Sequence, residues 1–545
     1  MELFDVVDLH MAETVMGPVR TASSSRTSNW QPRLVMAALA AIILMAAVLR
    51  FALANYSLWF DEYASLFFAH QPLARLWSTW LVRETNPPLY YSALHGWMML
   101  LGPMDRVMLR VPSIVASLLT ISILSAGIWR AFGNSAAIVG AAMLAVSAQQ
   151  VAYAHQVRGY SFFALAIFVS FVGLIWIITA NERDTRQSPW SWLAYVGGSV
   201  GAIYCHTTGF LWVPIASACL VAVDRDFLPG VGRHWLRLAV ADAAILLCSG
   251  WALFIVYSQL QHPNPNISWL EHLGISDTAH LLWESTLLAK APYARQAFAA
   301  AAVLAFSIGG VLFNWNSASV RFAAFCWGTA IAAFIVFSLK QPVLLERTVV
   351  WFAMFPAFLA AGSFQNIRRS NRFYAASGLV VALLLGNLIK THRDFVKEDW
   401  DGAVRTVAHD PGGVLLVRGE GHAIVAEEAC ELVERRSACS FPIVALTGDL
   451  NNAWANGYSR RPPTLANGTL RVGDRSDLYI IVRHAESPLN DIKAAGLFTR
   501  APIATGFLLG PYNHAFVTEL VGSGCVRGKL FHAVCNRGGH SRSTA

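Results

Sequence analysis

Stretches of about twenty residues that carry almost no charge recur along the chain from Leu34 to Lys390. Each is long enough to cross the roughly 30 Å hydrocarbon core of a lipid bilayer as an α-helix. Charged residues make up only 14% of the chain, whereas soluble proteins carry about 25%. The sequence therefore excludes a soluble globular enzyme and predicts a polytopic membrane protein.

Hydropathy places about eleven transmembrane helices in this apolar part. The expected spans are Leu34–Ala54, Val111–Trp129, Ala136–Ala152, Phe162–Ala180, Trp192–Cys205, Gly209–Val223, Leu238–Ser258, Phe298–Phe313, Phe322–Leu339, Val349–Gly362 and Phe373–Ile389. A further apolar segment, Leu89–Leu101, is short and begins after Pro87-Pro88. We expect it to be re-entrant or to lie at the membrane interface, because an apolar run of about 10 to 14 residues is usually too short for a span. A crossing there would reverse every later loop.

Five groups of arginines between the expected spans fall on one side of the membrane if eleven helices cross it. They are Arg130, Arg183, Arg186, Arg225, Arg233, Arg237, Arg321, Arg368, Arg369 and Arg372. By the positive-inside rule that side is cytoplasmic, which places the N-terminus inside and the chain after Ile389 outside the cell inner (cytoplasmic) membrane. The net charge of +8 is then explained by membrane orientation, and we expect no nucleic-acid partner.

Composition divides the chain into three parts. Residues 1–33 are polar and Ser-rich without the apolar core of a signal peptide, so they are expected to form a flexible cytoplasmic tail. Residues 34–391 form the transmembrane domain, in which a long outer loop, 55–110, is the first candidate for a functional segment. Residues 392–545 have the composition of a soluble domain. The predicted fold class is an all-α polytopic membrane domain followed by a small extracytoplasmic α/β domain.

Residues 392–545 are characterised by their expected secondary structure and by four cysteines. A helix is expected over Asp399–Ala408, with strands over Gly413–Val417 and Asp477–Val482. The four cysteines suit an oxidising compartment, and their spacing is not that of a zinc site. We expect the pairs Cys430–Cys439 and Cys525–Cys535, since short loops close at lower entropic cost, with free structural thiols as the alternative.

Adjacent carboxylates stand just past the first span. Asp61 and Glu62 follow Trp59-Phe60 at the bilayer surface. A carboxylate in a partly desolvated pocket can act as a general base toward a hydroxyl or amine, or help to hold a divalent ion. The alternative is that both acids are simply solvated at a helix end.

A second carboxylate, Glu84, stands with Asn86 in front of Pro87-Pro88. Proline fixes the start of a helix, so these polar side chains are expected at its mouth. A simple helix cap with an exposed acid is the alternative.

A cationic and aromatic group follows at Tyr153, His155, Arg158 and Tyr160. An arginine between aromatic residues at the membrane surface suits a phosphate, although snorkelling to lipid headgroups is the alternative.

His206 and Arg347 lie at the outer ends of later spans. The alternative to substrate binding is a structural role for His206 and an ion pair with Glu346 for Arg347. The loop from Gln259 to Arg295 carries residues of metal-binding types, at spacings that match no recognised metal motif: His262, Glu271, His272, His280 and Glu284.

Four motifs in this order resemble a known family. They are Leu58-Trp59-Phe60-Asp61-Glu62, Glu84-Thr85-Asn86-Pro87-Pro88-Leu89-Tyr90-Tyr91, Leu109-Arg110-Val111-Pro112-Ser113 and Tyr153 through Tyr160. Together they resemble integral-membrane glycosyltransferases of the GT-C fold, in particular the bacterial branch related to dolichyl-phosphate-mannose protein mannosyltransferases and the lipid A aminoarabinose transferase. Weaker similarity extends to Arg347 and to Lys397-Glu398-Asp399-Trp400.

The resemblance implies transfer of a hexosyl or pentosyl group from a polyprenyl-phosphate carrier to an envelope glycan, lipid or protein, with inversion at the anomeric carbon. It implies that Asp61 is the catalytic acid or base with Glu62 beside it, and that Arg158 and Arg347 contact phosphate. The family's Asp-x-His-Pro-Pro is here Glu84-x-Asn86-Pro-Pro, and Gln156 stands where many relatives have glutamate. These departures argue against a divalent cation cofactor, so we assign no residue as a metal ligand. They also allow Asp61 to act together with Glu84.

Two other classes stay open. A transporter or flippase of lipid-linked sugars would share the spans and the cationic pockets, and would add ionisable groups near the middle of the membrane, of which Asp242 is the nearest example. A sensor or scaffold would use the outer domain to bind a partner.

The topology can be tested with single cysteines placed at Arg369 and at Asn452 in a cysteine-depleted background. A membrane-impermeant thiol reagent applied to intact cells should label position 452 only. Labelling at position 369 would overturn the arrangement of eleven spans and would move the segment from His155 to Tyr160 to the cytoplasmic side.

Overall fold

The computed structural model describes residues 32–102, 104–261, 273–284, 294–340, 342–365, 371–394, 398–411, 413–417, 420–435, 439–445, 478–483, 515–520, 526–528 and 531–534. Several sequence predictions lie outside these residues. They concern most of the N-terminal tail, Arg368 and Arg369, three of the loop residues of metal-binding type (His262, Glu271 and His272) and the pair Cys525–Cys535.

Most of the described chain is helical, and five helices are long and apolar enough to cross a membrane. These are α2 (Pro32–Ala52), α6 (Arg106–Phe132), α9 (Tyr160–Glu182), α16 (Ala318–Ser338) and α18 (Asn371–Asp394). Two bent helix pairs raise the number to seven if each pair is one span. Shorter apolar helices cover Thr207–Val223, Phe298–Phe313 and Val350–Ser363. The chain is thus a multi-pass membrane protein, and the number of eleven spans stays a prediction.

The two bent pairs lie where spans are expected over Ala136–Ala152 and Leu238–Ser258, and each consists of two helices with a break between them. The first is α7 (Asn134–Ala145) and α8 (Ala148–Ala154), bent by 57°. At this break the Ser147 hydroxyl accepts a hydrogen bond from the Gln150 N–H, which starts a new helix. The second is α12 (Trp235–Cys248) and α13 (Gly250–Gln261), bent by 61°. The remaining helices of this part are α10 (Pro189–Cys205), η2 (Thr207–Leu211), α11 (Trp212–Val223), η3 (Arg225–Phe227), α14 (Ile275–Glu284), α15 (Ala294–Phe313), η5 (Val350–Ala353) and α17 (Met354–Ser363).

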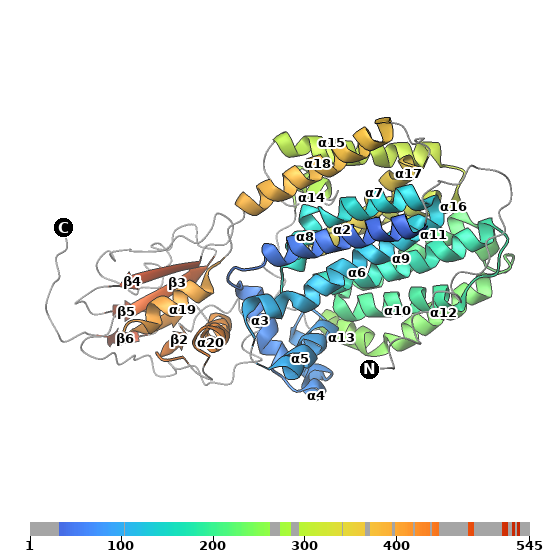
Figure 1. The fold of residues 1–545 in the computed structure, drawn as a ribbon. Helices are drawn as coiled ribbons and strands as arrows, with labels where there is room; N and C mark the ends of the chain where they lie inside the picture. The colour runs from blue at the N-terminus through green and yellow to red at the C-terminus, as the bar shows by residue number, and fades with distance from the viewer. Residues whose placement is uncertain are drawn as a thin grey trace, which may run out of the picture.

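Helices α6, α9 and α10 run side by side in the membrane part (Figure 1). The approach of α9 to α10 is close because Gly198 faces Ser170, where an added Cβ would lie 2.5 Å from a backbone nitrogen. The Ser170 and Ser199 hydroxyls hydrogen-bond across this contact at 3.0 Å. Such close packing fixes the start of α9 relative to the end of α10, and both ends carry candidate site residues.

Between α2 and α6 the outer loop folds into short helices, α3 (Phe60–Ala69), α4 (Leu73–Leu76), η1 (Thr79–Arg83) and α5 (Leu89–Leu101). With 13 residues, α5 is too short to cross the hydrocarbon core. It ends at Gly102, whose φ of 73° is readily adopted only by glycine.

The chain after α18 forms a mixed α and β structure (Figure 1). Its sheet has the strand order β2-β1-β3-β4, with β1 parallel to β2 and β3 and with β4 antiparallel to β3. The predicted helix and both predicted strands are confirmed to within one residue. The elements are α19 (Trp400–Ala408), β1 (Val414–Val417), α20 (Glu420–Glu434), β2 (Ile443–Ala445), β3 (Leu478–Arg483), β4 (Ala515–Leu520), β5 (Val526–Gly528) and β6 (Phe531–Val534).

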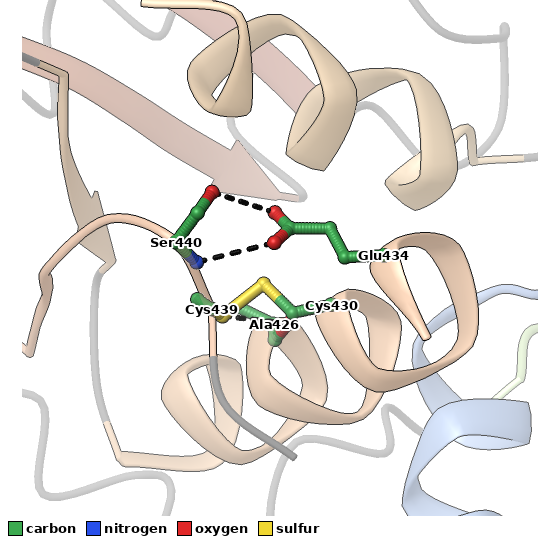
Figure 2. Close-up of a disulfide and its surroundings, with 5 residues drawn as sticks. All are labelled: Ala426, Cys430, Glu434, Cys439 and Ser440. Carbon is green, nitrogen blue, oxygen red and sulfur yellow. Dashed lines mark hydrogen bonds between the residues drawn. A yellow bond between two sulfur atoms is a disulfide. The ribbon is translucent and has the colours of Figure 1, made fainter. Parts of the chain in front are cut away.

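The expected disulfide between Cys430 and Cys439 is confirmed (Figure 2). It joins the last turns of α20 to the segment that enters β2. Glu434 supports the same turn, because its carboxylate accepts hydrogen bonds from the Ser440 hydroxyl at 3.0 Å and from the Ser440 N–H at 3.2 Å (Figure 2). The end of α20 is thereby fixed against the sheet.

Candidate active site

Glu62 lies at the centre of the outer-loop structure with no exposed surface. One carboxylate oxygen accepts a hydrogen bond from the Trp59 N–H at 3.0 Å, which closes the first turn of α3. The other accepts from the Val157 N–H at 2.8 Å and lies 3.5 Å from the Arg110 guanidinium. Glu62 therefore joins the helix that carries Asp61 to the loop that carries Arg158.

Arg110 is the partner of Glu62, and it is equally buried. Its guanidinium donates to the backbone oxygens of Ala54 at 2.7 Å, Tyr56 at 2.9 Å and His155 at 2.6 Å. It also lies 4.3 Å from the centre of the Tyr56 ring. A single side chain thus holds the end of α2, the entry to α3 and the loop between α8 and α9.

His155, a substrate-binding candidate from the sequence, lies inside this structure with 3% of its surface exposed. Its Nε2 is 2.8 Å from the Arg50 backbone oxygen, and its ring packs edge-on against Tyr56. The structure places His155 among packing contacts. Its role in binding substrate stays a prediction.

Arg158 extends from the α8–α9 loop toward α3. Its guanidinium donates to the Asp61 backbone oxygen at 3.2 Å, the Ser65 hydroxyl at 3.3 Å and the Tyr160 hydroxyl at 3.4 Å. These three acceptors are uncharged. Burial alone lowers the pKa of Arg158, but nearby acidic groups outweigh it and raise that pKa well above its usual value. The groups are Tyr160, Tyr91, Asp61 and Glu84.

The Asp61 carboxylate faces the other arginine predicted from the sequence. Its Oδ2 lies 3.7 Å from the Arg347 guanidinium, and about a quarter of each side chain is exposed, 23% and 27%. Thr348 fixes the loop that carries Arg347, since its hydroxyl donates to the backbone oxygen of Val343 and accepts from the Leu345 N–H at 3.0 Å. Asp61 and Arg347, 286 positions apart in the sequence, are therefore brought together by the fold.

Glu84 is fixed by its neighbours in front of α5. Its Oε1 accepts from the Asn86 amide at 2.8 Å, from the Asn86 N–H at 3.1 Å and from the Tyr91 hydroxyl at 3.1 Å. Glu84 remains partly exposed. Tyr91, which also contributes to the electrostatics of Arg158, is a residue that the sequence analysis quoted in a motif but did not select for the site.

His206, another candidate site residue, lies between α10 and η2. Its Nδ1 accepts from the Thr208 N–H at 3.2 Å, which leaves the proton of the neutral ring on Nε2. The ring stacks on Phe163 at 5.1 Å, while the neighbouring Tyr160 packs edge-on against Tyr153 at 5.5 Å. Burial first, and then Arg347 and Arg158, lower the pKa of His206 to about 3.

The low pKa of His206 has two consequences. The ring stays neutral between about pH 5 and 8, so it can donate a hydrogen bond there without acting as a charged acid. The unfolded chain takes up a proton at this residue below about pH 6.5, whereas the folded chain does not, so the folded state loses stability as the pH falls below that value.

A small cavity with room for about one water molecule borders this group. One edge is polar and includes Glu84, Thr85 and Asn86, with Thr207 from η2. The opposite wall is apolar and comes mainly from α13: Trp251, Ala252, Ile255 and Val256. Gln259 ties this wall to the outer loop, because its amide donates to the backbone oxygens of Val82 and Glu84.

Within the described residues, one cluster has ligands close enough for a metal ion, namely His70, Glu428 and Glu431. It lies where α3 ends against α20, and it involves none of the residues selected from the sequence. The expectation that the site uses no metal stays a prediction.

No protein-family model matches the chain, and no curated protein matches it. Among solved structures, ArnT from Cupriavidus metallidurans bound to undecaprenyl phosphate is 14% identical, with 90% of this chain and 99% of that chain covered at a TM-score of 0.53. The oligosaccharyltransferase of Archaeoglobus fulgidus is 11% identical, with 76% and 64% covered at a TM-score of 0.48. The chain has the GT-C membrane fold. This conclusion rests on the first of the two similarities and concerns the GT-C fold alone.

The two neighbouring carboxylates of this GT-C protein should respond differently to mutation. Glu62→Gln leaves Arg110 buried without its charged partner, and breaking a buried ion pair costs about 3–5 kcal/mol. Asp61→Asn changes a partly exposed group and should alter the free energy of unfolding by less than about 0.5 kcal/mol. The midpoint of thermal unfolding in detergent, monitored as the loss of monodisperse protein, measures the change in stability of both variants. Equal midpoints for the two variants would refute the structural role given to Glu62.

Proposed function

We propose that this protein transfers a sugar from a polyprenyl-phosphate carrier to a cell-envelope acceptor at the extracytoplasmic face of the inner membrane. The observation that carries the proposal is the convergence of one carboxylate and two guanidinium groups. Asp61 lies 3.7 Å from Arg347, and Arg158 hydrogen-bonds to the backbone oxygen of the same aspartate. A reaction in which a phosphate leaves while a hydroxyl loses its proton needs this combination.

In the proposed reaction the acceptor hydroxyl or amine gives its proton to the Asp61 carboxylate. The freed electron pair forms a bond to the anomeric carbon, and the bond from that carbon to the phosphate oxygen breaks. Polyprenyl phosphate leaves with the electron pair and carries a second negative charge. Arg158 and Arg347 stabilise that charge, and attack from the face opposite the phosphate inverts the anomeric carbon.

The remaining site residues divide into two groups. Glu84 and Asn86 line the small cavity, and we assign them to binding the sugar and the acceptor together with His206, Tyr153 and Tyr160. Glu62 and His155 are buried among backbone partners. We therefore assign these two residues to positioning the loop that carries Arg158, without contact to substrate.

A lipid-linked donor is supported by the surroundings of the site. The cavity beside Glu84 has an apolar wall on α13, and on the same helix Phe254 and Tyr257 are exposed, as expected for a lipid-facing surface. An isoprenoid tail next to a phosphate requires this junction of apolar and polar surfaces. The similar GT-C structure, ArnT, is described as bound to undecaprenyl phosphate.

The first test of this function is Asp61→Asn. The amide keeps the shape of the side chain but removes its basicity, so transfer should fall by about 10² to 10⁴. The assay follows a radiolabelled sugar from polyprenyl phosphate to an envelope extract with purified protein in detergent. Asp277→Asn changes an exposed carboxylate in the first turn of α14 and serves as the control with undiminished transfer.

Two outcomes would contradict the mechanism. Full transfer by Asp61→Asn would remove Asp61 as the base. Wild-type protein that moves the carrier across liposomes without consuming it would favour a transporter or flippase. That alternative draws on Asp242 within α12, whose carboxylate accepts hydrogen bonds from Tyr195 at 2.6 Å and Ser217 at 2.8 Å.

Arg158→Ala should give a different kinetic signature. Loss of a charge-assisted contact to phosphate should raise the donor KM and lower kcat, with a combined loss of about 10- to 100-fold in kcat/KM. Arg158→Lys keeps the charge without the planar fork and should recover part of the loss. An unchanged dependence on donor concentration in Arg158→Ala would exclude Arg158 from phosphate binding.

A further inference from the structure

Helix α3, which carries Asp61, begins at a position where the sequence offers no side-chain cap. Its N-cap residue is Trp59, whereas helices prefer Ser, Thr, Asp or Asn there. The Phe60 N–H, in the first turn, needs an acceptor. That acceptor is the Glu398 carboxylate at 3.0 Å, from a residue 338 positions later in the chain.

Glu398 is built into this contact. Only 1% of its surface is exposed, and the oxygen that receives the Phe60 N–H also accepts from the Trp400 indole at 2.8 Å. A carboxylate next to the first turn of a helix is favoured by the partial positive charge there. Asp61 follows Phe60 in that turn, so the hydrogen bond to Glu398 is made one position before the proposed base.

Asp401, three residues after Glu398, makes a second connection. It accepts hydrogen bonds from the Ser57 hydroxyl at 2.9 Å and from the Tyr63 hydroxyl, and it lies 3.2 Å from the Arg106 guanidinium. Burial first, and then Asp401, raise the pKa of Tyr63, so its hydroxyl keeps the proton that it donates. Asp401 thus joins the entry to α3, the helix itself and the start of α6.

Contacts continue along the whole of α3. Phe60 packs against the Trp400 and His422 rings at 6.2 and 5.1 Å. At the other end of the helix, His70 Nδ1 lies 2.9 Å from the Glu428 carboxylate on α20. In Figure 1, α20 lies next to α3. The chain after α18 therefore holds α3 at both of its ends.

We propose that Glu398 and Asp401 are positioning residues that fix the Asp61 carboxylate, so that the segment after α18 completes the active site. This inference rests on the proposed role of Asp61. Without the Glu398 carboxylate, the first turn of α3 loses its acceptor and Asp61 leaves its place opposite Arg347. With the Glu398 carboxylate in place, the proposed base is held by residues that follow α18 in the sequence.

A labelling experiment tests the positioning without any assay of sugar transfer. Asp61→Cys is treated with an impermeant maleimide in detergent, and modification is quantified by mass spectrometry of the peptide that carries residue 61. Adding Glu398→Ala should accelerate labelling severalfold because the first turn opens more often. Adding Glu398→Gln should leave the rate unchanged, since one amide oxygen can accept from both Phe60 and Trp400. Equal rates in all three proteins would overturn the proposal.

A double-mutant cycle on sugar transfer tests the route of the effect. Glu398→Ala should reduce kcat by about 10- to 100-fold with little change in the donor KM, whereas Glu398→Gln should stay near wild type. In the Asp61→Asn background the same Glu398→Ala change should have little further effect, because both act through one carboxylate. Arg405→Gln, on the exposed face of α19, is the matched control. Multiplicative losses in the double mutant would show that Glu398 acts elsewhere.

Asp401 offers a second, independent comparison. Asp401→Asn keeps an oxygen for Ser57 and Tyr63 but loses the charge opposite Arg106, so its effect on kcat should lie between those of the two Glu398 variants. If the wild-type protein transfers no sugar, the proposed function fails. The labelling rates still decide whether Glu398 holds residue 61.

Discussion

Arg110 and Glu62 meet at 3.5 Å with no exposed surface on either side chain, and the geometry of the candidate site depends on this pair. A buried charge is tolerated only when it is paired and hydrogen-bonded. Here the requirement is met by backbone groups from three segments: Ala54 after α2, Trp59 before α3, and His155 with Val157 in the α8–α9 loop. Because these groups belong to different helix ends, satisfying the two charges also fixes where α2, α3 and the α8–α9 loop stand relative to one another.

The site itself is made from such ends. Asp61 lies in the first turn of α3, Arg158 lies between α8 and α9, and His206 lies between α10 and η2. Helix ends leave N–H and C=O groups without partners inside the helix, and a membrane offers no water to satisfy them. Several ends meeting at one place can share those groups with side chains and with a substrate. The same meeting brings the Arg347 guanidinium to the Asp61 carboxylate and the Arg158 guanidinium to the Asp61 backbone oxygen, which suits the proposed reaction, whose charge moves from acceptor to phosphate.

Sequence patterns can select the candidate site residues, but they do not show how deeply each side chain is buried. The motifs around Asp61, Glu84 and Arg158 contain residue types that stand out against apolar spans, so they could be selected without coordinates. Whether a carboxylate faces a cavity or the interior depends on packing between distant segments. Glu62 and His155 are buried for that reason. In the sequence Glu398 stands out only as part of a weak motif, because no neighbouring residue indicates that it caps a helix 338 positions earlier.

The contrasting positions of Asp61 and Glu62 follow from helix geometry. Successive residues of a helix point about 100° apart, so neighbours in the first turn cannot share an environment. Glu62, the third residue of α3, reaches back to the Trp59 N–H and into the protein. Asp61 is thereby turned toward Arg347. The buried acid and its arginine fix the helix, Glu398 fixes its first turn, and the partly exposed acid is left available for chemistry. Under the proposed mechanism, stability and reactivity thus come from adjacent residues, and one acid cannot replace the other.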